Sequence, residues 1–293
     1  MRQGYFSRAW RAIRGSESWF GTLCLLSLVS LIPVFGTIVV SGYLLGWARD
    51  AAWGMENPLP RRVFGNEDGR LYRRGFFALV ISTVVAVCIG LFAFVCLSLL
   101  GIAAALFSVL FDDFSRAGVF AVSSWAGTTG IMVACVVLAF ASQFFVWIGL
   151  MRMSIYDTLG SGFQFGHMAA MAKRDISGLL KIFFYQLLAS LAAGVLLSVA
   201  WLVVAFLGIV VSMMLAGAAD FSGVSAYGLE GVAMLGLFSA GVFAVLVGYA
   251  SAVCVTLIQA LVYRSLGYWT ARFDVASWGS QDDPLPDAYP KAA

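Results

Sequence analysis

The sequence is poor in charged residues, since Lys, Arg, Asp and Glu make up only 11% of its 293 residues. A soluble domain carries roughly 25% charged residues. Hydrophobic residues make up 61% of the chain, and that much apolar surface cannot be hidden in a water-soluble core. The scarcity of charge therefore argues against a soluble protein and predicts an all-α, polytopic helical membrane protein.

Residues that could carry chemistry are also scarce. The chain has one histidine, His167, and its five cysteines lie inside apolar runs without metal-ligand spacing. It lacks the motifs of zinc metalloproteases, P-loop NTPases and serine hydrolases. The apolar runs carry no ionisable residue deep inside, which disfavours a proton pump or an intramembrane protease. We therefore expect no metal, no other cofactor and no enzymatic activity.

Long apolar runs are abundant instead. Four of them, at roughly 75–111, 117–151, 177–217 and 228–263, reach the ~20 residues that a transmembrane helix needs. All the Lys and Arg residues except Arg116 lie outside the two segments that join the first to the second run and the third to the fourth. Because cationic loops stay in the cytoplasm, both termini are predicted to be cytoplasmic.

The stretch at 19–48 is apolar but interrupted by Pro33 and Gly36. Proline removes a backbone donor and glycine tolerates a tight turn, so the pair predicts a bend between two short arms. The arms form either a thin helical hairpin or a re-entrant loop, and the alternative is one kinked helix. With the hairpin, the chain has about six membrane helices.

Residues 1–18 precede this hairpin. Phe6, Trp10 and Ile13 share one helical face, and Arg8 and Arg11 lie on the opposite face. Such a helix lies in the headgroup plane, which makes Arg8, Arg11 and Trp10 candidate contacts to lipid headgroups. A solvated leader is the alternative. The expected organisation is this interfacial helix at 1–18, a helical membrane domain at 19–271 and a cytoplasmic tail at 272–293.

Two segments that follow cytoplasmic helix ends are similar to each other in sequence. Each has Leu-Gly-aromatic, then a Trp and a Pro-Leu-Pro motif, and the residues concerned are Trp53, Pro58, Pro60, Trp278, Pro284 and Pro286. Proline stops a helix and tryptophan anchors at the interface. We interpret the pair as matched exits from two equivalent hairpins, with a docking site for a partner as the alternative.

The run Ile32–Gly36, the Gly42-Tyr43-Leu44 sequence, the Asn57–Pro60 exit and Arg74-Gly75 together resemble the opening of a prokaryotic membrane family described only as a domain of unknown function. The resemblance is clearest over 18–80 and looser from Phe163 onward. It implies a membrane protein and brings no assigned activity.

Three long amides lie inside the apolar runs near their cytoplasmic ends: Gln143, Gln186 and Gln259. They are expected to hydrogen-bond between helices. The sharper alternative is a shared polar pocket for a lipid headgroup or a small solute.

Three classes of function stay open from the sequence. The first is a non-enzymatic scaffold or subunit of the cytoplasmic (inner) membrane, multi-pass, with membrane lipids and another membrane or cytoplasmic protein as partners, and no nucleic acid. The second is a small permease or transporter component, in which the Pro33–Gly36 break serves a substrate site. The third is a lipid-modifying enzyme using Asp157, Asp175 and His167.

Overall fold

The structure is a computed structural model that describes residues 4–65, 69–110, 114–220 and 226–285. Within these residues the chain is helical, without strands, which confirms the all-α prediction. The helices are α1 (Tyr5–Arg14), α2 (Trp19–Ser30), α3 (Phe35–Ala52), α4 (Leu71–Leu110), α5 (Phe114–Tyr156), α6 (Phe165–Arg174), α7 (Ile176–Asp220) and α8 (Ala226–Thr270), with short 3-10 turns η1 (Gly160–Phe163), η2 (Ala271–Phe273) and η3 (Val275–Ser277).

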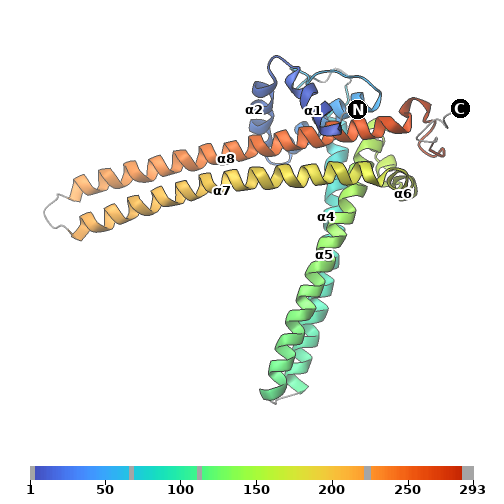
Figure 1. Cartoon of the computed structure of the whole chain (residues 1–293). Coiled ribbons are helices and arrows are strands. Elements are labelled where there is room, and N and C mark those ends of the chain that lie inside the picture. Colours follow the sequence, from blue (N-terminus) through green and yellow to red (C-terminus); the bar gives the residue numbers. More distant parts are fainter. Residues whose placement is uncertain (1–3, 66–68, 111–113, 221–225, 286–293) are drawn as a thin grey trace.

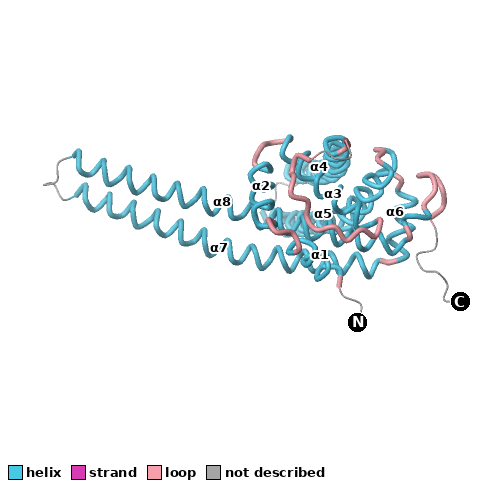
Figure 2. The backbone as a smooth tube through the Cα atoms, turned by 90° about the horizontal axis from the view of Figure 1, so that it is seen from above, coloured by secondary structure: helices cyan, strands magenta, loops and turns pink. Residues whose placement is uncertain are grey.

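Two long helical hairpins dominate the molecule. Helices α4 and α5 run side by side, as do α7 and α8, and the two pairs leave a common region in different directions (Figure 1). Seen from above, α7 and α8 project away from the region where α3 to α6 gather (Figure 2). We call that common region, which also holds α1, α2 and the segments after α3 and α8, the base.

The long helices have the dimensions of membrane spans. Among the described residues, four stretches are long and apolar enough to cross a membrane: Leu71–Ala103, Trp125–Tyr156, Ile176–Val211 and Phe238–Phe273. In the most apolar window of each, at most 11% of the residues are buried within the chain. Water cannot be the solvent of so much apolar surface, so the fold is that of a membrane protein.

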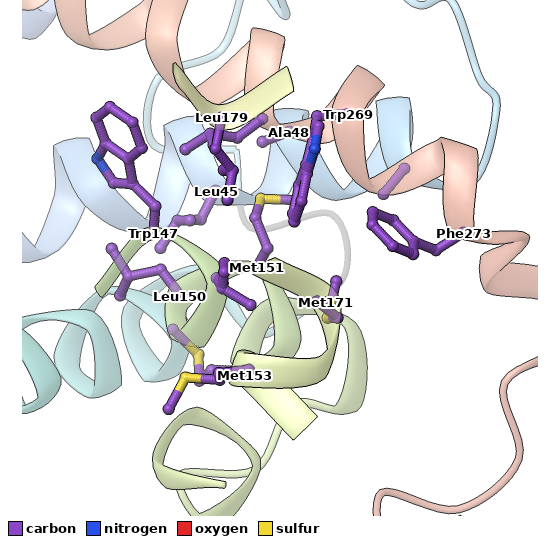
Figure 3. Close-up of a cluster of buried hydrophobic side chains, with 14 of the residues drawn as sticks. Leu45, Ala48, Trp147, Leu150, Met151, Met153, Met171, Leu179, Trp269 and Phe273 are labelled. Carbon is purple, nitrogen blue, oxygen red and sulfur yellow. The ribbon is translucent and has the colours of Figure 1, made fainter. Parts of the chain in front are cut away.

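The base has a packed core that joins both hairpins. Leu45 and Ala48 of α3 meet Trp147 and Met151 of α5 there, and Trp269 of α8 packs on the same cluster (Figure 3). At Gly267 a Cβ would lie 2.2 Å from the Ala48 carbonyl oxygen, so α8 approaches α3 backbone to backbone, and only glycine permits this.

Helix α5 continues past the predicted end at 151. The helix ends at Tyr156, and the next residue, Asp157, has a φ of 53°. The added turn is part of the base, where Met151, Arg152 and Met153 are all fully buried. Much of the stretch between residues 152 and 176, which separates two of the predicted apolar runs, forms the end of α5, η1 and α6. Hydropathy alone does not detect this, because Arg152 resembles a loop residue when its burial is unknown.

The bend at Pro33 separates two helices. Helix α2 ends at Ser30 and α3 begins at Phe35, and Val34 between them has a φ of 63°. A Cβ on Gly36 would lie 2.0 Å from the Val29 carbonyl oxygen. Glycine is therefore required for α3 to start against the end of α2, and one continuous kinked helix is not what the chain forms.

Candidate functional site

The most charged part of the base surrounds Asp157, directly after α5. Its carboxylate accepts a hydrogen bond from Arg70 Nη1 at 2.5 Å and one from Arg74 Nη2 at 3.4 Å. Arg49 Nη1 lies 3.8 Å from the same carboxylate. The Asp157 side chain is 10% exposed and that of Arg74 is 2% exposed, so α3, α4 and α5 are joined by a largely buried ionic cluster.

A cavity of about 180 Å³ lies beside this cluster, between α3, the start of α4 and the segment after α3. Arg49, Arg62, Arg74 and Asp50 line it. We call it the arginine cavity. Burial raises the pKa of the Asp50 carboxyl above its ordinary value, although the guanidinium groups of Arg49, Arg264 and Arg74 act to lower it.

Two segments of the base are held by buried arginines. We call residues 53–60 the first strap and residues 278–285 the second strap. Arg264 of α8 is fully buried and donates to three backbone oxygens: Nη1 to Trp47 at 2.5 Å, and Nη2 to Met55 at 3.0 Å and Asn57 at 2.9 Å. Its guanidinium also lies 4.6 Å from the ring centre of Trp47 and 5.1 Å from that of Tyr268. The first strap is therefore fixed to α3 by a cation from α8.

Arg152 of α5 holds the second strap in a similar way. It is fully buried, and its Nη2 donates to Gln164 Oε1 at 2.6 Å and to the Gln281 carbonyl at 3.1 Å. Its guanidinium lies 5.3 Å from the ring centre of Tyr156 and 5.7 Å from that of Trp278. Its Nε and Nη1 are buried without a hydrogen-bond partner among the described residues.

Both arginines belong to the same short sequence pattern, which the distribution of charge does not reveal. Arg152 and Tyr156 are spaced as Arg264 and Tyr268 are, and in each pair the guanidinium lies over the ring one turn later. The distribution of charge alone assigns both arginines to the cytoplasmic side and gives them no further role. The signal that could have found them is this repeated Arg-x-x-x-Tyr at the ends of two apolar runs.

A scan against family profiles matches residues 25–204 to a family described as "Protein of unknown function (DUF4013)". The match runs from α2 into α7 and covers more than half of the chain. The chain belongs to this family. The expected resemblance to a domain of unknown function is thereby confirmed, whereas the membrane character rests on the long helices. Searches of curated proteins and of solved structures gave no match to this DUF4013 member.

In this DUF4013 member the two Pro-Leu-Pro motifs occupy similar environments. Their central residues, Leu59 and Leu285, are 1% and 9% exposed, so each inserts into a core cluster. The described flanking prolines, Pro58, Pro60 and Pro284, are exposed, and Pro286 lies outside the described residues. Trp53 is exposed, whereas Trp278 stacks on Tyr156 with ring centres 5.9 Å apart. Both the interpretation as matched exits and a docking role stay predictions.

The three predicted amides are not joined by a hydrogen bond in the described part of the chain. Gln143 and Gln186 are half-buried on α5 and α7, and Gln259 is exposed on α8. The Gln186 Oε1 atom is buried without a hydrogen-bond partner among the described residues. A pocket shared by these amides stays a prediction.

Helix α1 packs on protein with its apolar side. Ala9 and Ile13 are fully buried, and Phe6 meets Tyr185 of α7 with ring centres 5.2 Å apart. On the polar side, Arg8 Nη2 donates to Glu56 Oε1 at 2.5 Å, and this hydrogen bond lowers the pKa of the Glu56 carboxyl.

Helix α1 therefore contacts the first strap through Arg8. Arg11 lines the neighbouring groove, and Trp10 meets Trp19 with ring centres 5.8 Å apart. Contact of Arg8, Arg11 and Trp10 with lipid stays a prediction.

The candidate enzyme residues do not form one constellation in the described residues. Asp157 belongs to the ionic cluster above. Asp175 caps α7 by accepting from the Gly178 backbone N–H at 3.1 Å, and Arg272 Nη1 donates to it at 2.5 Å. His167 lies on α6, half-buried, beside a groove under the second strap. Both carboxylates thus have structural partners that account for their positions.

Proposed function

We propose that the chain is a non-enzymatic scaffold of the cytoplasmic membrane that organises lipid and a further membrane or cytoplasmic protein. One observation carries this proposal. The span-length helices leave the base as two divergent hairpins whose apolar windows are at most 11% buried within the chain. That surface is available to lipid and to partner helices along nearly its whole length.

The charges of the base support a cytoplasmic position for it. The arginine cavity, the Arg264 and Arg152 contacts and α1 all lie there, and cationic segments stay on the cytoplasmic side. In this orientation α2 and α3 enter from the cytoplasm and return to it. With the four long helices they make six membrane helices and two cytoplasmic termini.

Helix length and divergence have one common explanation in this proposal. A 36-residue span such as Ile176–Val211 is about 54 Å long at ~1.5 Å per residue, against ~40–45 Å for a whole bilayer with headgroups. A tilt of about 35° removes the excess, which is within the range seen for membrane helices. Two hairpins tilted in opposite senses from one base would both fit the bilayer and diverge from each other.

The geometry favours a scaffold over a permease. Transporters bind solute near mid-membrane between packed helices. Here the ring contacts between the hairpins, Phe140, Phe144 and Trp147 of α5 with Phe183 of α7, lie on the parts of both helices nearest the base. Beyond these contacts, the described parts of both hairpins present apolar surface that is little buried within the chain.

Reconstitution of the full chain in liposomes tests this function. We expect no flux of small anions, amino acids or sugars above that of protein-free liposomes, and no change in the lipid composition over time. Mass spectrometry of the protein purified from native membrane should identify lipid and a reproducible protein partner. Solute flux would instead establish a permease, and a converted lipid would establish an enzyme.

A further inference from the structure

The arginine cavity has the charge and size of an anion site. Arg49, Arg62 and Arg74 line it, and Arg70 adjoins it through Asp157. Among the described residues that line the cavity, three carry a guanidinium group and one, Asp50, carries a carboxylate. A phosphate monoester carries about −1.5 to −2 at neutral pH, and a lining with more guanidinium groups than carboxylates suits such an anion.

The shape of the cavity agrees with a small ligand. Its volume of about 180 Å³ is below the ~300 Å³ at which pockets for larger small molecules begin. Arginine presents a planar fork of donors that fits the oxygens of a phosphate. A phosphate group, and not a whole metabolite, is what this space holds.

One glycine determines where the buried arginine lies. A Cβ on Gly46 would be 2.7 Å from Arg74 Nη1, so the guanidinium occupies space that any other residue at position 46 would fill. Gly46 also lines the cavity. The Arg74 guanidinium is therefore held at the wall of the cavity, next to Asp157, by the missing side chain on α3.

We propose that the arginine cavity binds a phosphate group, presented by a phosphomonoester lipid headgroup or by free phosphate. The cavity lies at the end of α3 nearest the first strap, which the proposed function puts at the headgroup level of the cytoplasmic leaflet. The inference rests on the proposed function only for the lipid as source, because free phosphate would bind whatever the role of the hairpins.

The test uses the purified full chain and two probes. Inorganic phosphate is titrated by calorimetry in detergent, and phosphatidic acid retention is measured by native mass spectrometry from phosphatidylcholine nanodiscs that contain it. Binding of inorganic phosphate identifies the free anion as a sufficient ligand. Retention of phosphatidic acid without phosphate binding identifies the lipid headgroup.

Two adjacent arginines give a matched pair of variants. Arg62 lines the cavity, whereas the neighbouring Arg61 pairs with Glu17, and both are exposed. Arg62→Gln should weaken binding about tenfold or more, the loss of one charge-assisted hydrogen bond. Arg61→Gln removes the same charge from the same loop and should leave binding unchanged. Gly46→Ala should also weaken binding, since it displaces the flexible end of Arg74 while the fold is kept.

Three results would overturn the inference. The first is that neither probe binds. The second is that Arg61→Gln weakens binding as much as Arg62→Gln does, because binding would then depend only on the net charge of the loop. The third is that Arg62→Gln and Gly46→Ala both bind as the wild type does. None of these depends on solute flux or lipid turnover, so the site can fail while the scaffold function stands.

Discussion

Replacing Arg264 with methionine tests whether the base is held together by buried cations. The substitution keeps an unbranched side chain of comparable length and removes the guanidinium. Three backbone carbonyls, those of Trp47, Met55 and Asn57, then lose the guanidinium as a donor, and that of Asn57 keeps a second donor, Trp47 Nε1 at 3.1 Å. Two of them belong to the first strap, and Trp47 belongs to α3.

The magnitude follows from the contacts. A hydrogen bond to a charged group contributes about 1.5–3 kcal/mol, so three bonds amount to at least about 4.5 kcal/mol. The cation also lies over two aromatic rings, worth about 1 kcal/mol more. Against this, methionine avoids the desolvation cost of a buried cation, which is several kcal/mol. Avoiding that cost offsets part of the loss. We expect a net loss of about 3–5 kcal/mol in the free energy of unfolding.

Arg152→Met is the matched comparison. Arg152 is equally buried, but only its Nη2 has hydrogen-bond acceptors among the described residues, at Gln164 and Gln281. Its removal relieves two buried donors without acceptors in the described residues. Its loss should therefore cost less than that of Arg264, about 1–3 kcal/mol.

Denaturation of both variants in detergent micelles, followed by far-UV circular dichroism, measures these differences. Proteolysis of the first strap in the native state gives a second readout, which Arg264→Met should accelerate and Arg152→Met should not. If Arg264→Met unfolds within about 1 kcal/mol of the wild type, or if Arg152→Met is the more damaging, the hydrogen-bond reasoning is wrong.

Two further predictions concern the bend and the topology. Gly36→Leu should lower the yield of folded protein and expose α2 to protease, because any Cβ there meets the Val29 carbonyl at 2.0 Å; normal yield and protection would contradict a required close approach. In a cysteine-free background, cysteines at Phe64 and Gly160 should be labelled only from the cytoplasm and one at Ser222 only from outside. Labelling of Phe64 from outside would refute the two cytoplasmic termini.

The long helices could be predicted from sequence because hydrophobic runs of span length have few alternatives. The break at Pro33 and Gly36 was also predictable, because proline and glycine act on the local backbone. The end of α5 and the presence of α6 were not predicted. They depend on Arg152 being buried under the second strap, more than 120 residues later in the chain.

The candidate site also has parts that could be predicted from the sequence and parts that could not. Pro-Leu-Pro motifs repeat visibly in the sequence, so their equivalence could be inferred before their contacts were known. The arginine cavity could not be inferred, because Arg49 and Arg74, which line it together, belong to different helices, and Arg74 reaches it over Gly46. Sequence order separates these residues, and only the packing of α3 on α4 brings them together.

The exchange of arginines between the hairpins explains how two diverging pairs of helices form one body. The first strap leads into α4 and α5, but Arg264, which holds it, belongs to α8. The second strap follows α8, but Arg152, which holds it, belongs to α5. Each hairpin thus carries the cation that fixes the strap of the other. Helices that share little surface along their length need such a connection at one end, because lipid gives apolar helices no hydrophobic reason to stay together. Polar contacts at the base can supply that cohesion and leave the apolar surfaces beyond it open to lipid and partners.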